Sequence, residues 1–343
     1  MLLDSPSLKI RFADRALPAA LKTLRVLLLP WPMSWRIRFG GWAGWVAGRV
    51  SKRRRLALNN LKRAFGSESS YTRRELERIR DHSYRDLGRS MTEFLMSESI
   101  DATYFASHVE VEHEDRLRAL VVEGKGAVLL TAHFGNWEFL NLMAGVRGHA
   151  LAVLAKPQKL AATDAYLNRL RSLRGARVVM RGIDMRQLYR TLEAGGLAGV
   201  LADQDGGPQG IYAPLFGRRS SYPRGVARFS YKTGSPALPV FTVRHGLDRH
   251  RIHVGTPVRP QAGESEDDFE KRVVADFSRQ LEAMVRRHPS QWLWAHRRWK
   301  SSPDRDIVVL DDGRKGHTHQ SQALAAQVSA RRAETTEFHA SAE

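Results

Sequence analysis

His133 and Glu138 are the side chains of this sequence best suited to chemistry, and they are spaced as H-x4-E. An imidazole paired with a carboxylate is a common general base, because the carboxylate fixes the tautomer and stabilises the imidazolium that forms. We predict that His133 takes a proton from a substrate hydroxyl and that Glu138 orients the ring. The spacing alone is weak evidence, since such a pair is more often a helix cap.

The elements on either side of this pair strengthen the prediction. The apolar run 126–132 is typical of a buried strand, and the segment 137–143 has the composition of a helix. Two residues five apart do not share one helical face, so His133 must lie in the turn while Glu138 begins the helix. Ligands of open α/β sheets bind at the carboxyl ends of strands, which is where this arrangement places the imidazole.

A second segment has the same organisation. Residues 199–202 form a short apolar run that leads directly into Asp203-Gln204-Asp205, so acidic side chains again follow a predicted strand. A loop rich in turn formers and cations comes next and includes Arg224. The alternative is a solvated turn that is capped by an aspartate.

Strands and helices alternate over about 200 residues, which predicts one α/β domain with a mainly parallel sheet flanked by helices. Further strands are expected at 151–155, 176–180, 238–243 and 251–254. Helices are expected at 71–99, from a single apolar stripe, and around 269–284, where acidic residues precede the stripe and basic residues follow it.

Several classes of chemistry lack their usual residues. The chain has no cysteine, which excludes thiol catalysis and disulfides, and its 13 histidines show no metal-binding spacing such as H-E-x-x-H. No Walker loop or G-x-S-x-G elbow is present. We therefore expect no metal and no resident cofactor, and activity that survives chelators and thiol reagents.

The net charge of +19 predicts attraction to anionic surfaces. Within residues 16–50, four of the eight tryptophans are interleaved with arginines and short apolar runs, which favours the membrane interface. The longest uncharged stretches there have ten residues, whereas a spanning helix needs about twenty. We predict a peripheral or monotopic protein on the cytoplasmic face of a membrane; the alternative is a helical hairpin that covers the core.

The motifs together resemble the lipid A lauroyl and myristoyl acyltransferases of the lysophospholipid acyltransferase superfamily. The order and spacing agree from about residue 15 to 302. The matching segments are Arg53 to Leu61 (R-R-x-x-A-x-x-N-L), Gly124 to Glu138 (a strand and H-F-x-x-x-E), Asp203 to Asp205 (D-Q-D), Pro214 to Gly217 (P-x-F-G) and Gln291 to Lys300 (Q-x-x-W-x-H-R-R-x-K).

This resemblance implies transfer of a fatty acyl chain from an acyl carrier protein or coenzyme A thioester to a hydroxyl of a membrane glycolipid, foremost a lipid A precursor. His133 would be the base and Glu138 its partner, with an arginine at 171 or 169 and an acid at 205 or 203. An acidic acyl carrier protein and an anionic lipid are the implied partners. The alternative acceptors are a glycerophospholipid or a phosphatidylinositol mannoside.

Contacts to substrate are expected around the same motifs. Apolar residues after His133 should hold the acyl tail, because the thioester carbonyl must reach the base, and Tyr222-Pro223-Arg224 departs from the small or hydroxyl residues that relatives carry there. The predicted substrate contacts are Phe134, Asn136, Trp137, Met143, Arg169, Asp203 and Arg224.

Three regions are predicted: a membrane-interface helical segment at 1–50, an acyltransferase α/β domain at 51–303, and a linker with the start of a possible βαβ module at 304–343. In the last region we expect a strand at 307–310, a loop at 311–317 and a helix at 321–329. A function of a different class, nucleic-acid binding by the basic clusters 52–55, 73–74 and 296–300, is the remaining alternative.

Overall fold

The computed structural model describes residues 8–304 except 67, 69, 181 and 183, and parts of 319–328. The chain divides into two compact units, Met1–Ser302 and Pro303–Glu343. The strand expected at 307–310 and the loop after it lie outside the described residues. Those residues of the expected helix at 321–329 that are described are helical.

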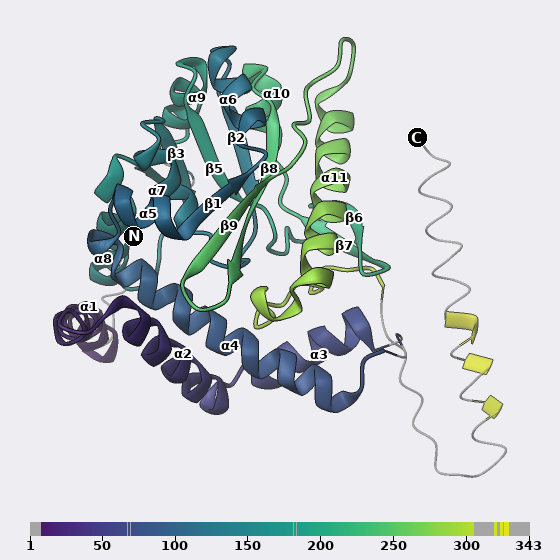
Figure 1. Cartoon of the computed structure of the whole chain (residues 1–343). Coiled ribbons are helices and arrows are strands. Elements are labelled where there is room, and N and C mark those ends of the chain that lie inside the picture. Colours follow the sequence, from purple (N-terminus) through teal and green to yellow (C-terminus); the bar gives the residue numbers. More distant parts are fainter. Residues whose placement is uncertain are drawn as a thin grey trace. The chain divides into compact units, whose positions relative to one another are not determined.

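A seven-stranded sheet forms the centre of the first unit, in the order β1-β9-β8-β2-β5-β3-β4 (Figure 1). Every neighbouring pair is parallel except β8 and β9. The predicted α/β fold with a mainly parallel sheet is confirmed. The strands are β1 (Val109–Glu112), β2 (Ala127–Thr131), β3 (Leu151–Ala155), β4 (Arg177–Met180), β5 (Leu197–Leu201), β8 (Ala237–His245) and β9 (Arg249–Val254), with a separate antiparallel pair β6 (Ile211–Leu215) and β7 (Arg218–Tyr222).

Helices cover both faces of this sheet. The described α-helices are α1 (Leu8–Leu28), α2 (Met33–Val50), α3 (Arg54–Phe65), α4 (Arg73–Leu95), α5 (Ala102–His108), α6 (Glu114–Val122), α7 (Phe139–Val146), α8 (Ala161–Arg171), α9 (Arg186–Glu193), α10 (Arg228–Thr233) and α11 (Glu266–Arg287). Along β2, Val128 and Leu130 join a core cluster with α3, α9, α10 and α11, whereas Ala127 and Leu129 join one with α5, α6 and α7. The alternation follows from the two-residue period of a strand.

Helix α2 packs closely on α4 through glycines. A Cβ at Gly40 would lie 2.1 Å from Oγ1 of Thr92, and a Cβ at Gly44 would lie 2.3 Å from the carbonyl oxygen of Tyr84. Trp35 and Trp42, also on α2, are more than half exposed. The helix therefore has one face fixed to the protein and tryptophans on its exposed surface.

In the described part of the chain, no helix combines the length and the apolar character needed to cross a bilayer.

Candidate active site

The register of two central strands brings His133 and Asp203 together. Strands β2 and β5 are parallel neighbours, and Thr131 of β2 pairs with Leu201 of β5. His133 and Asp203 each follow two residues after this pair, so both emerge at the same carboxyl edge of the sheet. The two side chains thus meet at the carboxyl ends of the strands, where α/β folds bind ligands.

Asp203 is the carboxylate that contacts the imidazole. Nδ1 of His133 lies 2.8 Å from Oδ1 of Asp203, and the backbone N–H of His133 donates to Oδ2 at 3.1 Å. The indole N–H of Trp292 donates to Oδ2 as well, at 3.0 Å. Because an ionised carboxylate only accepts hydrogen bonds, Nδ1 must carry the proton. Nε2 is then the basic nitrogen of His133.

Burial and charge set the protonation of this pair. Burial by itself would lower the pKa of His133, but the negative charge of Asp203 and its hydrogen bond outweigh burial and raise that pKa above its usual value. Burial would raise the pKa of Asp203, yet the charge of His133 and the bonds from His133 and Trp292 lower it to about 2. Asp203 therefore stays ionised beside a basic imidazole.

Glu138, the expected partner of His133, is engaged elsewhere. It precedes α7 and accepts from Arg171, with 2.9 Å between Arg171 Nη2 and Glu138 Oε1, and from Asn141 at 2.9 Å. The predicted pairing of Glu138 with His133 is corrected to Asp203, because strand register places Asp203 closer than the start of the helix can. Glu138 still adds to the charge that raises the pKa of His133.

The geometry distinguishes the two arginines and the two aspartates left open by the sequence. Arg171 is half-buried with Glu138, whereas Arg169 is exposed and pairs with Glu98 at 3.5 Å. Asp205 accepts from the backbone N–H and the hydroxyl of Ser301 and does not contact His133. Arg171 and Asp203 are therefore the members of each pair that lie close to the imidazole.

A cavity opens beside His133, lined by Trp137, by Ser83, Tyr84 and Leu87 of α4, and by residues 291–295. The Trp137 and His133 rings lie edge to face, with 5.1 Å between their centres. Trp137 therefore lines the cavity beside His133, and its contact with substrate stays a prediction.

The other predicted substrate contacts, Arg169 and Asp203 included, do not line this cavity. Phe134 and Met143 are buried in the two core clusters, because they lie on faces that pack against the sheet. Asn136 is buried and donates to Glu93, and Arg224 is held at the surface by Asp267. Their contacts with substrate stay predictions, since apolar character and proximity to His133 also describe ordinary core packing.

Comparison with known proteins identifies the family of this chain. The model of the family described as bacterial lipid A biosynthesis acyltransferase matches residues 13–301. The chain belongs to this family. It is 24% identical over 282 residues to the lipid A biosynthesis lauroyltransferase of Escherichia coli (strain K12), covering 81% of this chain and 89% of that protein. It is 25% identical over 257 residues to the palmitoleoyltransferase of the same strain, covering 74% and 81%.

A solved structure, the 1-acyl-sn-glycerophosphate acyltransferase of Thermotoga maritima, aligns over 79% of this chain and 97% of its own, with a TM-score of 0.36 and 16% sequence identity. The family match establishes that the protein is an acyltransferase of the lipid A biosynthesis family, as its motifs predicted. The individual roles of His133, Glu138, Arg171 and Asp203 stay predictions.

The loop that carries His133 in this acyltransferase depends on a glycine. Gly135 has a φ of +56°, and a Cβ there would lie 1.7 Å from the carbonyl oxygen of Thr242 in β8. The Gly135 N–H donates to the carbonyl of Gln291 at 2.8 Å, and its own carbonyl accepts from the Ser90 hydroxyl. Any side chain at Gly135 would push the loop away from β8 and α4.

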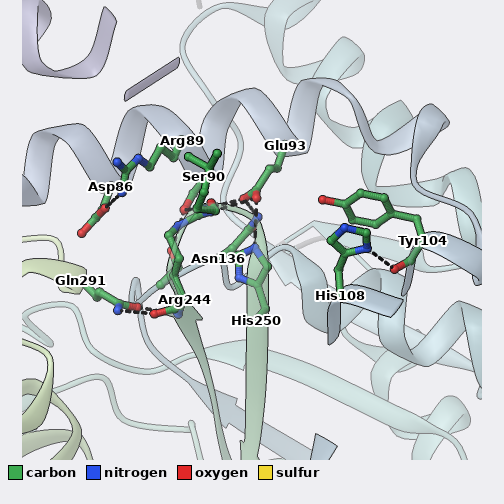
Figure 2. A network of polar contacts seen from close by, with 12 residues as sticks. Asp86, Arg89, Ser90, Glu93, Tyr104, His108, Asn136, Arg244, His250 and Gln291 are labelled. Carbon is green, nitrogen blue, oxygen red and sulfur yellow. Dashed lines mark hydrogen bonds and ion pairs between the residues drawn. The ribbon is translucent and has the colours of Figure 1, made fainter. Parts of the chain in front are cut away.

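Behind this loop lies a buried polar network, shown in Figure 2. Glu93 of α4 accepts from Asn136 at 2.8 Å, from Arg244 of β8 at 2.9 Å and from the His250 ring of β9 at 3.0 Å. Glu93, Arg244 and His250 are all at most 2% exposed in their side chains. The network joins α4, β8 and β9 to Asn136, three residues after His133.

The sequence contains little that would identify this second network. Its members are spread over α4, β8 and β9, and no local spacing connects residues 150 positions apart. Trp292 and Gln291 did stand within the closing Q-x-x-W-x-H-R-R-x-K motif, which could have marked them as contacts of the active-site loop. Their contacts, to Asp203 and to Gly135 and Arg244, became visible only in three dimensions.

In the part of the chain that the structure describes, one group of side chains could hold a metal ion: Glu112, His113 and His253, whose ligand atoms lie within 4.8 Å of one another. Glu112 ends β1, His113 follows it and His253 lies on β9, so the group includes none of the residues around His133.

Proposed function

We propose that this acyltransferase moves a fatty acyl chain from an acyl thioester to a hydroxyl of a membrane glycolipid, with a lipid A precursor as acceptor. The observation that carries the proposal is the His133 ring, which faces a cavity while a buried, ionised Asp203 holds Nδ1. Membership of the lipid A family and the names of the two relatives from Escherichia coli support a glycolipid acceptor.

The reaction needs one base and accurate positioning, because a thioester carbonyl is already activated. In the proposed mechanism, Nε2 of His133 accepts the proton of the acceptor hydroxyl as its oxygen attacks the thioester carbonyl. The tetrahedral intermediate then breaks the carbon–sulfur bond, and His133 returns the proton to the leaving thiolate. The products are an ester and a free thiol, so no proton is gained or lost.

Asp203 and the Arg171–Glu138 pair have different roles in this mechanism. Asp203 fixes the tautomer and stabilises the imidazolium through a direct hydrogen bond. Glu138 holds the Arg171 guanidinium beside the ring of Phe94, and both charges are close enough to change the pKa of His133. We assign the pair to shaping the electrostatic potential around the base.

The donor and the location follow from charge and exposed surface. A net charge of +19 favours an acidic acyl carrier protein as the donor, with coenzyme A as the alternative. The exposed tryptophans of α2 favour peripheral binding at the cytoplasmic face of the inner membrane. The proposed reaction uses the acyl thioester as donor and needs no resident cofactor.

The test is acyl transfer by the purified full chain, followed by mass spectrometry of the products. Donors are lauroyl and palmitoyl thioesters of acyl carrier protein and of coenzyme A, and acceptors are a lipid A precursor, a lysophospholipid and a phosphatidylinositol mannoside. We expect an added acyl ester on the lipid A precursor, which His133→Ala should lose. Acylation of another acceptor only would replace the proposed substrate, and transfer undiminished in His133→Ala would refute the assigned base.

A further inference from the structure

A concave site of about 390 Å³, separate from the catalytic cavity, lies between α2, α3 and α4. We call it the arginine cleft. Two carboxylates, Glu77 and Asp81, also line it, so the charged side chains sum to six positive minus two negative, or +4. The arginines are Arg49, Arg54, Arg74, Arg78, Arg80 and Arg85. The proposed mechanism uses none of them.

Asp81 organises part of the arginine cleft. Its carboxylate accepts from Nη1 of Arg54 and from Nε of Arg80, both at 2.8 Å, and lies 3.8 Å from Arg49. One negative charge cannot neutralise three cations, so this cluster keeps a positive charge. The other carboxylate, Glu77, pairs with Arg73 at 3.1 Å, which does not line the cleft.

Three further arginines add cationic groups. Across the residues that the structure describes, Arg74, Arg78 and Arg85 form no ion pair, although the charge of Glu75 is close enough to Arg78 to interact with it. A guanidinium presents N–H groups in a fork that matches two oxygens of a phosphate. Several such forks around a concave site, with too few carboxylates to occupy them, fit an anion that has several oxygens.

The surroundings of the cleft indicate where this anion is found. Trp45 of α2 lines the cleft, and the Arg49 guanidinium stacks over its ring at 4.6 Å. Trp42, three residues earlier on α2, is 58% exposed. Tryptophans at a membrane surface lie at the depth of the lipid head groups, where the phosphates are. A phosphate at this depth would lie beside Trp45.

We propose that the arginine cleft binds the phosphate group of a membrane lipid head group. Helix α4 supplies both sites: Arg78, Arg80 and Arg85 line the cleft, while Ser83, Tyr84 and Leu87 line the catalytic cavity. A head group in the cleft would therefore hold the membrane surface against the helix that forms one wall of the active site. This inference rests on the proposed function only for the presence of a membrane.

The test compares vesicle binding by the full chain and by a double variant, Arg74→Ala with Arg78→Ala, since both arginines are exposed and outside the Asp81 cluster. The vesicles are phosphatidylcholine with and without one fifth phosphatidic acid. A matched control, Arg118→Ala with Arg177→Ala, removes the same charge at exposed positions elsewhere. Each cation at an anionic surface is worth a factor of about five, so the cleft variant should bind about 25-fold more weakly and the control less than about two-fold.

Each other outcome has a defined meaning. Equal weakening in both double variants would reduce the effect to net charge and overturn the proposal. Calorimetry could show that the unaltered protein binds inorganic pyrophosphate and the cleft variant does not. If the two proteins bound vesicles equally, this result would assign the site to a soluble phosphate instead. If the cleft variant lost turnover with acyl carrier protein thioesters but not with coenzyme A thioesters, the cleft would be assigned to binding the carrier protein. Failure of the unaltered protein to bind any vesicle would refute the membrane location itself, whereas the catalytic proposal is tested by product formation.

Discussion

Two of the histidine–carboxylate pairs in the described residues, His133 with Asp203 and His250 with Glu93, contact the loop 133–136, and the pKa values of the two histidines shift in opposite directions. In the front pair, Asp203 raises the pKa of His133. In the rear pair, burial and the positive charge of Arg244 lower the pKa of His250, although Glu93 accepts a hydrogen bond from its ring. The pKa values of the two carboxylates do not differ in this way. Burial would raise the pKa of both Glu93 and Asp203, but the neighbouring cations outweigh burial and lower each pKa to about 2.

The difference shows that a carboxylate partner does not by itself make a histidine basic. His250 is sealed from solvent, and burial together with the charge of Arg244 outweighs the charge and the hydrogen bond of Glu93. Among the described residues, no arginine forms an ion pair with Asp203, and the His133 ring lines a cavity. The first pair is suited to proton transfer and the second to holding α4, the loop and the sheet together.

The largest contrast is expected from removing each histidine. His133→Ala should lower acyl transfer by about 10⁴, because a positioned general base contributes on that order. His250→Ala should leave turnover per folded molecule within about ten-fold and lower the urea midpoint, since the ring is buried away from substrate. Comparable losses of turnover in the two variants, at equal folded fraction, would remove the distinction between the pairs.

The carboxylate of the front pair should follow in size. Asp203→Asn should reduce kcat by roughly 10² to 10⁴, because the amide can present a donor to Nδ1 and favour the wrong tautomer. Steady-state kinetics at neutral pH measure this. Its matched control is Asp205→Asn, which lies two residues away and contacts Ser301. An Asp203→Asn variant with the kcat of the unaltered enzyme would show that His133 needs no carboxylate partner.

A smaller loss is expected for Glu138→Gln. Glu138 does not hydrogen-bond His133, so the variant should lose about 10-fold to 10²-fold in kcat by loosening Arg171 and removing a nearby negative charge. Arg171→Lys, assayed in parallel, should give a loss of the same order, because lysine cannot form the two-pronged contact. A Glu138→Gln defect greater than that of Asp203→Asn would restore Glu138 as the partner of the base.

The smallest effect on turnover, but a large one on stability, is expected for Glu93→Gln. Removing one partner from a buried ion pair leaves an uncompensated charge and should cost about 3 to 5 kcal/mol of unfolding free energy. Because the pKa of Glu93 is lowered from 4.5 to about 2, its contribution to stability is present above pH 4.5 and is lost as the pH falls toward 2. Urea unfolding between pH 3 and 7 should show a weaker pH dependence in the variant.

The sequence predicted the strands and the helices that surround the site better than the contacts within it. The apolar runs before His133 and Asp203 fall on β2 and β5, and the charged ends of the stripe around residue 277 bound α11, because periodicity and helix-end charge are local properties. Which acid meets His133 depends on the register Thr131 to Leu201, which no single segment encodes. The buried state of Asn136 likewise depends on Glu93 from a distant helix.

The pH dependence of kcat/KM tests the central claim, that Asp203 rather than Glu138 makes His133 basic. In the unaltered enzyme, activity should rise with pH through a pKa above 6.5, since His133 must lose its proton to act as a base. In Asp203→Asn, burial is no longer offset by the Asp203 charge, so the pKa that sets the acid limb of the profile should fall below its value in the unaltered enzyme. This fall should exceed the one in Glu138→Gln. An acid limb that moves in Glu138→Gln and stays in place in Asp203→Asn would contradict the account.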